Sequence, residues 1–187
     1  MIVALLAAAA LAGLNPTASV PLAPTAADHA PGSCHVRIAA VGYQLPDPLC
    51  TPGAINPTLT VAVLTDPAFR TGMVRDKVTS EAAKRVVYGW FGITPPANNT
   101  GANQTCELDH VVDLASGGAD TLDNVWPQCQ APGSAPVLVG VREFKIKDRF
   151  AEHNVMALVK AGGNLADLQR RIAANWTLFI PTAAGAH

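Results

Sequence analysis

The strongest candidate for chemistry in this sequence is an aspartate directly followed by a histidine, Asp109 and His110. A carboxylate can bind a hard divalent cation through oxygen. A neutral imidazole can accept a proton from water, because its unperturbed pKa lies near neutrality. Glu107 lies two residues before Asp109, on the same face of a strand, and is a second carboxylate for the metal or for a supporting contact. The pair is therefore a candidate centre for metal-assisted hydrolysis.

The elements that must position this pair follow from the alternation of apolar and polar residues. Residues 107–114 alternate in this way, which predicts a strand. A glycine pair within residues 115–120 predicts a tight turn, followed by a return segment in which Trp126 is expected to be a core residue. Because adjacent side chains on a regular strand point to opposite faces, the aspartate and the histidine can share a site only if the strand ends or bulges there.

Three helices are predicted around these strands. One follows a cap at residue 79 or 80 and packs through Trp90, the second runs from about residue 139 to 161, and the third covers 165–176 with Asn164 as its cap. With 15 glycines and 15 prolines in 187 residues, the chain is also expected to be rich in loops. The expected fold class is α+β, with a small β-hairpin and a helix at its core, additional helices and an irregular N-terminal segment.

The four cysteines indicate export to an oxidising compartment and two disulfides, because their number is even and no C-x-x-C pair occurs. Three pairings are possible, and short loops favour Cys34 with Cys50 and Cys106 with Cys129. The first bridge would tie the irregular N-terminal segment, and the second would clamp the segment that carries the candidate site. The alternative is a zinc site with four cysteine ligands, although structural zinc usually draws its ligands as closely spaced pairs, which this sequence lacks.

The N-terminus has the composition of an export signal. Residues 1–14 are almost wholly apolar, which is too short for a membrane span of roughly 20 residues and typical of a signal-peptide core. We therefore expect a secreted protein with no stable membrane association after cleavage; the alternative is a lipid-associated N-terminal helix. The expected divisions are a signal peptide, a disordered leader, the N-terminal part of the domain, the site-bearing core and a tail (1–19, 20–32, 33–104, 105–176 and 177–187).

The distribution of charge suits a polyanionic substrate. The formal net charge of −1 argues against a chain that is basic throughout, as a nonspecific DNA coat would be. Basic residues nevertheless concentrate between residues 70 and 85 and after residue 141, on both sides of an acidic centre at 107–123. Phosphate contacts are expected from the basic side chains on or just before the predicted site helix, Arg142, Lys145, Lys147 and Arg149. The alternative is that these residues form ordinary solvated helix faces.

The window from Glu107 to Gln128 resembles the signature of HNH endonucleases, in which an Asp-His pair, a Gly-Gly turn, a later aspartate and an asparagine occur in this order. The match is tighter to a group of exported bacterial and phage HNH-like proteins with the core E-L-D-H-x-x-x-L-x-x-G-G-x-x-x-x-x-N-x-W-P-Q. Flanking stretches also resemble that group, so the likeness covers about residues 45–176.

This resemblance implies a ββα-metal fold, in which a β-hairpin and a following helix clamp one divalent ion, and hydrolysis of nucleic-acid phosphodiesters. His110 would activate the attacking water, and Asp109 would bind the ion, with Mg²⁺ favoured and Mn²⁺ as the alternative. Asn124 would orient His110 by a hydrogen bond. The substrate would be DNA, with RNA as a further candidate.

The second metal ligand implied by the resemblance lies on the helix, where the sequence offers His153 and Glu152. We expect His153 to be the ligand, with Glu152 as its rival. The cysteine pairs that hold structural zinc in many HNH domains are absent, so no structural zinc is expected. Relatives often have cysteine at the position of Lys160, a departure that suggests a different disulfide arrangement in this chain.

Two other classes of function are compatible with these residues. One is a secreted binding or structural module that keeps the hairpin and helix without catalysis, in which alanine at Asp109 and His110 would leave the function intact. The other is an exported metallohydrolase that acts on another phosphodiester or on an ester.

Overall fold

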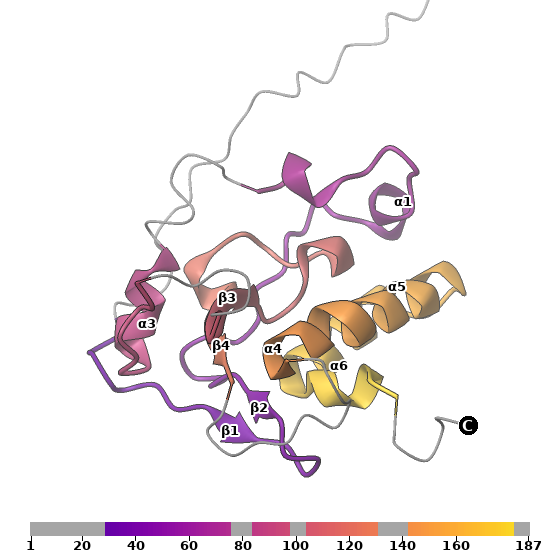
Figure 1. Ribbon diagram of the computed structural model, residues 1–187. Coiled ribbons are helices and arrows are strands. Elements are labelled where there is room, and N and C mark those ends of the chain that lie inside the picture. Colours follow the sequence, from indigo (N-terminus) through magenta and orange to yellow (C-terminus); the bar gives the residue numbers. More distant parts are fainter. Residues whose placement is uncertain (1–28, 76–83, 98–103, 131–141, 182–187) are drawn as a thin grey trace, which may run out of the picture.

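Two small antiparallel hairpins and a series of short helices form the part of the chain that the structure describes. The computed structural model describes residues 29–75, 84–97, 104–130 and 142–181. Strand β1 pairs with β2 and strand β3 with β4, so the fold is mixed α+β (Figure 1). The strands are β1 (Arg37–Ile38), β2 (Gln44–Leu45), β3 (Cys106–His110) and β4 (Val125–Cys129).

The helices are short, and the longest consecutive series lies near the C-terminus. The α-helices are α1 (Val61–Leu64), α3 (Val86–Trp90), α4 (Glu143–Ile146), α5 (His153–Lys160) and α6 (Leu165–Ala174). A π-helical segment, η5 (Lys147–Glu152), joins α4 to α5. The 3₁₀ turns are η1 (Thr71–Met73), η3 (Leu114–Ser116), η4 (Leu122–Asn124) and η6 (Trp176–Phe179).

The β3–β4 hairpin lies centrally, with α3 on one side and the α4–η5–α5 series on the other (Figure 1). Its register pairs Asp109 with Trp126 and His110 with Val125. The predicted strand to residue 114 is too long, because β3 ends at His110 and the chain turns into η3. This ending meets the condition under which Asp109 and His110 can share one site. Trp126 is fully buried, as predicted.

The predicted site helix is present as the consecutive segments α4, η5 and α5, of which the middle one has the wider turn of a π-helix. Residues 139–141 of the predicted range lie outside the described residues. The helix ends before Gly162, which has a positive φ of 89°, as the glycine stop signal predicted. The predicted cap of the last helix is confirmed, since Asn164 accepts a hydrogen bond from the backbone nitrogen of Asp167 at 2.9 Å.

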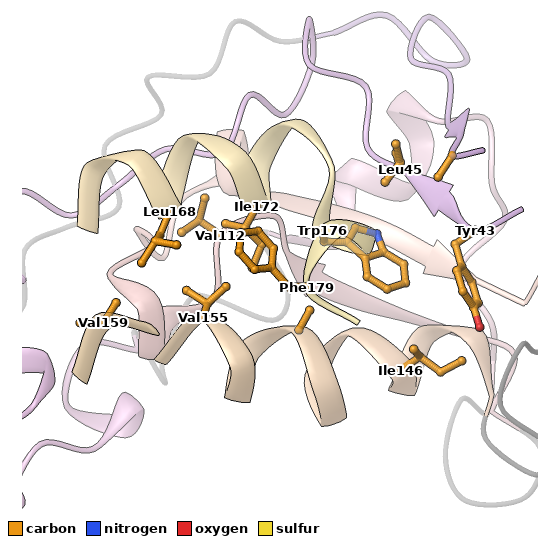
Figure 2. Close-up of a cluster of buried hydrophobic side chains, with 12 residues drawn as sticks. Tyr43, Leu45, Val112, Ile146, Val155, Val159, Leu168, Ile172, Trp176 and Phe179 are labelled. Carbon is orange, nitrogen blue, oxygen red and sulfur yellow. The ribbon is translucent and has the colours of Figure 1, made fainter. Parts of the chain in front are cut away.

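The main hydrophobic core lies between α5 and α6 (Figure 2). Val155 and Val159 of α5 face Leu168 and Ile172 of α6, and all four side chains are almost completely buried. Trp176 extends this core toward β2, where its indole nitrogen donates a hydrogen bond to the carbonyl of Gln44 at 2.9 Å. The burial of these apolar side chains fixes the helix series against the rest of the fold.

Both favoured disulfide pairings are confirmed. Cys34 bonds to Cys50 beside Val87 and Trp90, so α3 packs through Trp90 as predicted. Its predicted caps at residues 79 and 80 lie outside the described residues. Cys106 bonds to Cys129 across paired positions of the β3–β4 hairpin. Because all four sulfurs are in disulfides, the alternative four-cysteine zinc site is excluded. Two disulfides also suggest an oxidising, extracellular environment.

Residues of the expected leader and of the expected tail make contacts with the folded part of the chain. The predicted signal peptide at 1–19 lies outside the described residues, as does most of the predicted leader. The last part of that leader contacts α3, since the backbone nitrogen of Gly32 donates to the carbonyl of Gly89 at 2.9 Å. In the expected tail, Phe179 is 5% exposed and belongs to the main core. Among the described residues, no helix combines the length and apolar character that crossing a membrane requires.

Candidate metal and hydrolytic site

A cavity of about 620 Å³ lies beside the end of β3, between the hairpin and the η5 segment. It brings together most of the residues predicted from the sequence, which are Glu107, Asp109, His110, Lys145, Arg149, Glu152 and His153. Three predicted residues do not line it, namely Asn124, Arg142 and Lys147. The wall also contains residues that the sequence analysis did not assign, among them Arg75, Asp113 and Asp148.

His110 is held from one side by a buried carboxylate. Its Nε2 atom lies 2.7 Å from Oδ1 of Asp120, and Lys84 donates a hydrogen bond to the same oxygen. Because the carboxylate accepts, Nε2 carries the hydrogen and Nδ1 is left with its lone pair. Nδ1 has no hydrogen-bond partner among the described residues, and the residue lines the cavity. Burial lowers the pKa of His110 below its ordinary value, which keeps the ring neutral and able to accept a proton.

Asp120 is the main residue of this arrangement that sequence reasoning missed. Its signals were an acidic side chain two residues after the glycine pair and the later aspartate of the HNH signature, a position that Asp120 or Asp123 can fill and that was given no role. Such signals do not reveal a histidine partner ten positions earlier, because the contact depends on the path of the intervening turn. No pattern in the sequence indicated that Lys84 would contact Asp120. In the structure its side chain is only 2% exposed.

Three carboxylates gather in the cavity from two elements. Glu107 and Asp109 lie two residues apart on β3, and Asp148 lies on η5; each offers an oxygen within 4.8 Å of the others. Burial raises the pKa of Glu107 to about 7 and that of Asp109 to about 7. Oε1 of Glu107 is buried without a hydrogen-bond partner, and Oδ2 of Asp109 is buried with only the ammonium of Lys147 beside it, at 3.0 Å. This donor set fits a hard divalent cation, which prefers oxygen ligands and would offset the repulsion between these acids.

A second group of carboxylates shares Asp148. Asp113 and Glu152 each offer an oxygen within 4.8 Å of that residue and of each other. Burial raises the pKa of Asp113 to about 6 and also raises the pKa of Glu152. The acidic residues thus form a continuous wall from β3 to the end of η5.

The predicted helix ligand His153 does not join either group of carboxylates within the described residues. It is exposed at the cavity, and its Nδ1 lies 2.8 Å from the carbonyl of Arg149, one turn earlier on the same helix. Glu152, named as its rival, groups with Asp113 and Asp148, and not with Asp109, among the candidate metal-binding sets of the described residues. The structure therefore favours Asp148 over both as the helix partner of Asp109. The spacing of residues along the helix does not indicate Asp148. Its carboxylate lies near that of Asp109 because of the way the helix packs against β3.

Lys147 is not a surface residue, and its predicted role as a phosphate contact is wrong. Its side chain is 0% exposed, and Nζ donates to the carbonyl of His110 at 2.7 Å and to a carboxylate oxygen of Asp113. Nζ also lies 3.0 Å from Oδ2 of Asp109, an ion pair without hydrogen-bond geometry. Burial alone would lower the pKa of Lys147, but the charges of Asp109 and Asp113 raise it above its ordinary value.

The other basic residues divide between the cavity and its surroundings. Lys145 is 45% exposed and forms an ion pair with Glu107. Arg149 is exposed and lines the cavity together with Arg75. Arg142 does not line the cavity, and its guanidinium donates to the carbonyl of Gln104 at 2.6 Å, so the structure does not support it as a phosphate contact at this site.

Asn124 shapes the site through the backbone, so its predicted hydrogen bond to His110 is absent. Its amide accepts from the nitrogen of Val112 and donates to the carbonyl of the same residue, both at 2.9 Å. It also donates to the carbonyl of Ala119 at 2.7 Å. Asn124 therefore closes the loop that follows His110, and this loop carries Asp120 back to the imidazole.

No family model matches this chain, and neither the curated proteins nor the solved structures contain a match to it.

Proposed function

We propose that this protein is a secreted, metal-dependent nuclease of the ββα-metal HNH kind, which hydrolyses phosphodiester bonds of nucleic acids. One observation carries the proposal: a neutral histidine, held at Nε2 by Asp120, lines the same cavity as the carboxylates of Glu107, Asp109 and Asp148. A proton acceptor beside a cation-binding set of oxygens is what hydrolysis of a phosphate ester requires.

In the proposed mechanism His110 is the general base. Its Nδ1 accepts a proton from the attacking water, while Nε2 keeps its hydrogen bond to Asp120. The negative charge of Asp120 stabilises the imidazolium that forms, in the same way that an orienting carboxylate supports a histidine base in other hydrolases. The low pKa of His110 keeps it unprotonated before the reaction.

Glu107, Asp109 and Asp148 are the residues that would hold one divalent ion, Mg²⁺ or Mn²⁺. When bound, the ion supplies positive charge that stabilises the negative charge developing on the phosphate and on the leaving oxygen. The ion pair between Lys145 and Glu107 supports one ligand from the helix side.

The substrate class is supported by the basic side chains at the cavity. Arg75, Lys145 and Arg149 line it, and each can contact a phosphate of a bound strand. Such contacts are independent of base sequence and weaken as salt concentration rises. Because both acidic and basic side chains line this cavity, a polyanion is expected to approach it where the cations face the strand.

The proposal is tested by incubating purified protein with plasmid DNA and with RNA, in Mg²⁺, in Mn²⁺ and in a chelator. Cleavage of either polymer that requires the metal supports a nuclease. If the folded protein cleaves neither polymer under any metal but hydrolyses a small phosphodiester such as bis(p-nitrophenyl) phosphate, the substrate class is wrong. If it hydrolyses none of these, the proposal of a phosphodiester hydrolase is wrong.

A further inference from the structure

We infer that Lys147 is a positioning residue of the proposed centre, an internal cation that holds His110 and Asp109 in register and does not touch the substrate. The inference rests on the proposed nuclease function. Its basis is burial together with contact geometry, since the side chain is completely buried and does not line the cavity that receives the substrate. A lysine in that position cannot reach a phosphate of a strand bound in the cavity.

The contacts of Lys147 converge on the end of β3. Nζ donates to the carbonyl of His110 at 2.7 Å, which fixes the main chain of the general base at the point where the strand stops. The same nitrogen lies 3.0 Å from Oδ2 of Asp109. One ammonium thus restrains both members of the Asp-His pair, which a regular strand would direct to opposite faces.

The third contact ties this pair to the loop. Lys147 also donates to Oδ1 of Asp113, immediately before η3. Asp113 is 4% exposed and lies in the second group of carboxylates. Lys147 therefore connects the end of the strand, the start of the loop and the helix through a single buried atom.

The geometry of the helix changes at this lysine. Lys147 is the first residue of the π-helical segment η5, and its neighbour Asp148 lines the cavity. Segments of π-helix are rare and are often retained at functional sites, because they alter which side chains face a given direction. Lys147, at the start of this segment, is buried against the end of β3, whereas Asp148 and Glu152 line the cavity.

Charge explains why a cation is needed at this point. Asp109 and Asp113 are both buried, and burial of two like charges without a counterion is strongly unfavourable. Lys147 supplies that counterion from within the protein, so the two carboxylates keep their positions before any metal arrives.

The test compares Lys147→Met with Arg149→Met, a neighbour that is exposed and lines the cavity. At saturating metal, Lys147→Met should lower kcat on plasmid DNA on the order of 100-fold, as expected for misplaced reacting groups, while KM stays within twofold. The slope of log K against log salt for DNA binding should be unchanged. Arg149→Met should instead raise KM and reduce that slope by about one, with kcat little changed.

The opposite pattern overturns the inference. If Lys147→Met folds and lowers the salt slope by about one with kcat unchanged, the lysine is a phosphate contact. If it changes neither parameter, the lysine is only structural. Should Lys147→Met fail to fold, the variant Lys147→Met with Asp113→Asn removes one of the charges left unpaired, and the same loss of kcat is expected from it.

A measurement that does not depend on nuclease activity tests the burial of Lys147 separately from the nuclease proposal. Brief acetylation of the native protein, followed by peptide mass spectrometry, should modify the exposed Lys160 and leave Lys147 unmodified. Equal modification of the two lysines contradicts the buried position, whether or not the protein is a nuclease. Conversely, protection of Lys147 in a protein without nuclease activity leaves the geometry intact and removes its proposed catalytic purpose.

Discussion

Nε2 of His110 lies 2.7 Å from Oδ1 of Asp120, and both side chains are more than nine-tenths buried. The glycine turn between β3 and β4 makes this contact possible, because it brings a residue ten positions later back to the end of the strand. The pair gives the imidazole a fixed orientation and leaves Nδ1 as the ring nitrogen that can take a proton. A histidine supported in this way is oriented and unprotonated before the reaction, because burial lowers its pKa.

Asp120→Asn tests this support. The amide keeps the size of the side chain but removes the negative charge opposite the imidazolium, and its NH₂ group can hold the ring in the wrong tautomer. We expect kcat to fall at least ~100-fold with KM for DNA nearly unchanged, in line with such substitutions in other histidine-carboxylate pairs. Steady-state cleavage of plasmid DNA measures both parameters. A variant with kcat within twofold of the parent would show that Asp120 does not support the base.

Gly118→Ala tests the turn that carries Asp120. A Cβ at Gly118 would lie 1.8 Å from the carbonyl oxygen of Val112 and 2.7 Å from Nδ2 of Asn124, so the loop must move. We expect the free energy of unfolding to fall by about 3 kcal/mol, within the range for severe core clashes, together with loss of nuclease activity. Urea unfolding measures the first effect.

Gly72→Ala is the matched control, because a Cβ at that position meets nothing within 4 Å and its φ is not positive. It should leave stability within about 0.5 kcal/mol of the parent, as surface substitutions usually do. Equal stability losses in the two variants would mean that the close approach at Gly118 is not the cause.

The disulfide between Cys106 and Cys129 should matter for activity as well as stability. It closes a sequence separation of 23 residues across paired positions of the hairpin that carries the site. Replacing both cysteines by alanine should lower the free energy of unfolding by about 3 kcal/mol and also lower kcat at 20 °C, because the hairpin loosens. Removal of the Cys34–Cys50 bridge should lower stability but leave kcat unchanged at that temperature. Similar kcat values for the two double variants would argue against a link between the hairpin bridge and the site.

The stability of the metal-free protein should fall as pH rises from about 6.5 to 8. Burial raises the pKa of Glu107 and of Asp109 to about 7, well above the values near 4 that these carboxyls have when unfolded. The folded state therefore binds protons more tightly, and this contribution to stability is lost as pH rises through 7. Because the pKa of His110 is lowered in the folded state, this residue makes stability rise with pH. That effect is confined to pH values below about 6.5, the pKa of an unfolded histidine.

Thermal melts in chelator across this range measure the effect, and Mn²⁺ should reduce the fall, because the cation binds the ionised carboxylates. Glu107→Gln, which removes one of the titrating groups, should also show a smaller fall in Tm. A Tm that is flat from pH 6.5 to 8 in chelator would contradict the burial of these acids beside one another.

Local patterns in the sequence predicted the hairpin, the glycine turn, the Asn164 cap and both disulfides, because each depends on residues that lie close together in the chain. The burial of Lys147 could not be predicted in the same way. A long basic side chain on a helix has the same appearance in the sequence whether it points to solvent or is buried, and the burial of Lys147 depends on how the helix packs against the end of β3.

The partners of the site residues were equally hidden. Asn124 was expected to hold His110 and instead holds the backbone of Val112, while Asp120 holds the histidine. Both residues lie in the turn that the pattern identified, but the turn path determines which polar group meets which. The choice of Asp148 over His153 beside Asp109 likewise depends on how the helix lies against β3.

The most direct test of the central claim is the rate of plasmid cleavage by His110→Ala in saturating Mg²⁺ or Mn²⁺. His35→Ala is the matched control, because His35 is exposed and does not line the cavity. The account predicts that the parent and His35→Ala cleave at equal rates, that His110→Ala is slower by a factor on the order of 1000, and that chelator stops all cleavage. Full-rate, metal-dependent cleavage by a folded His110→Ala protein would contradict it.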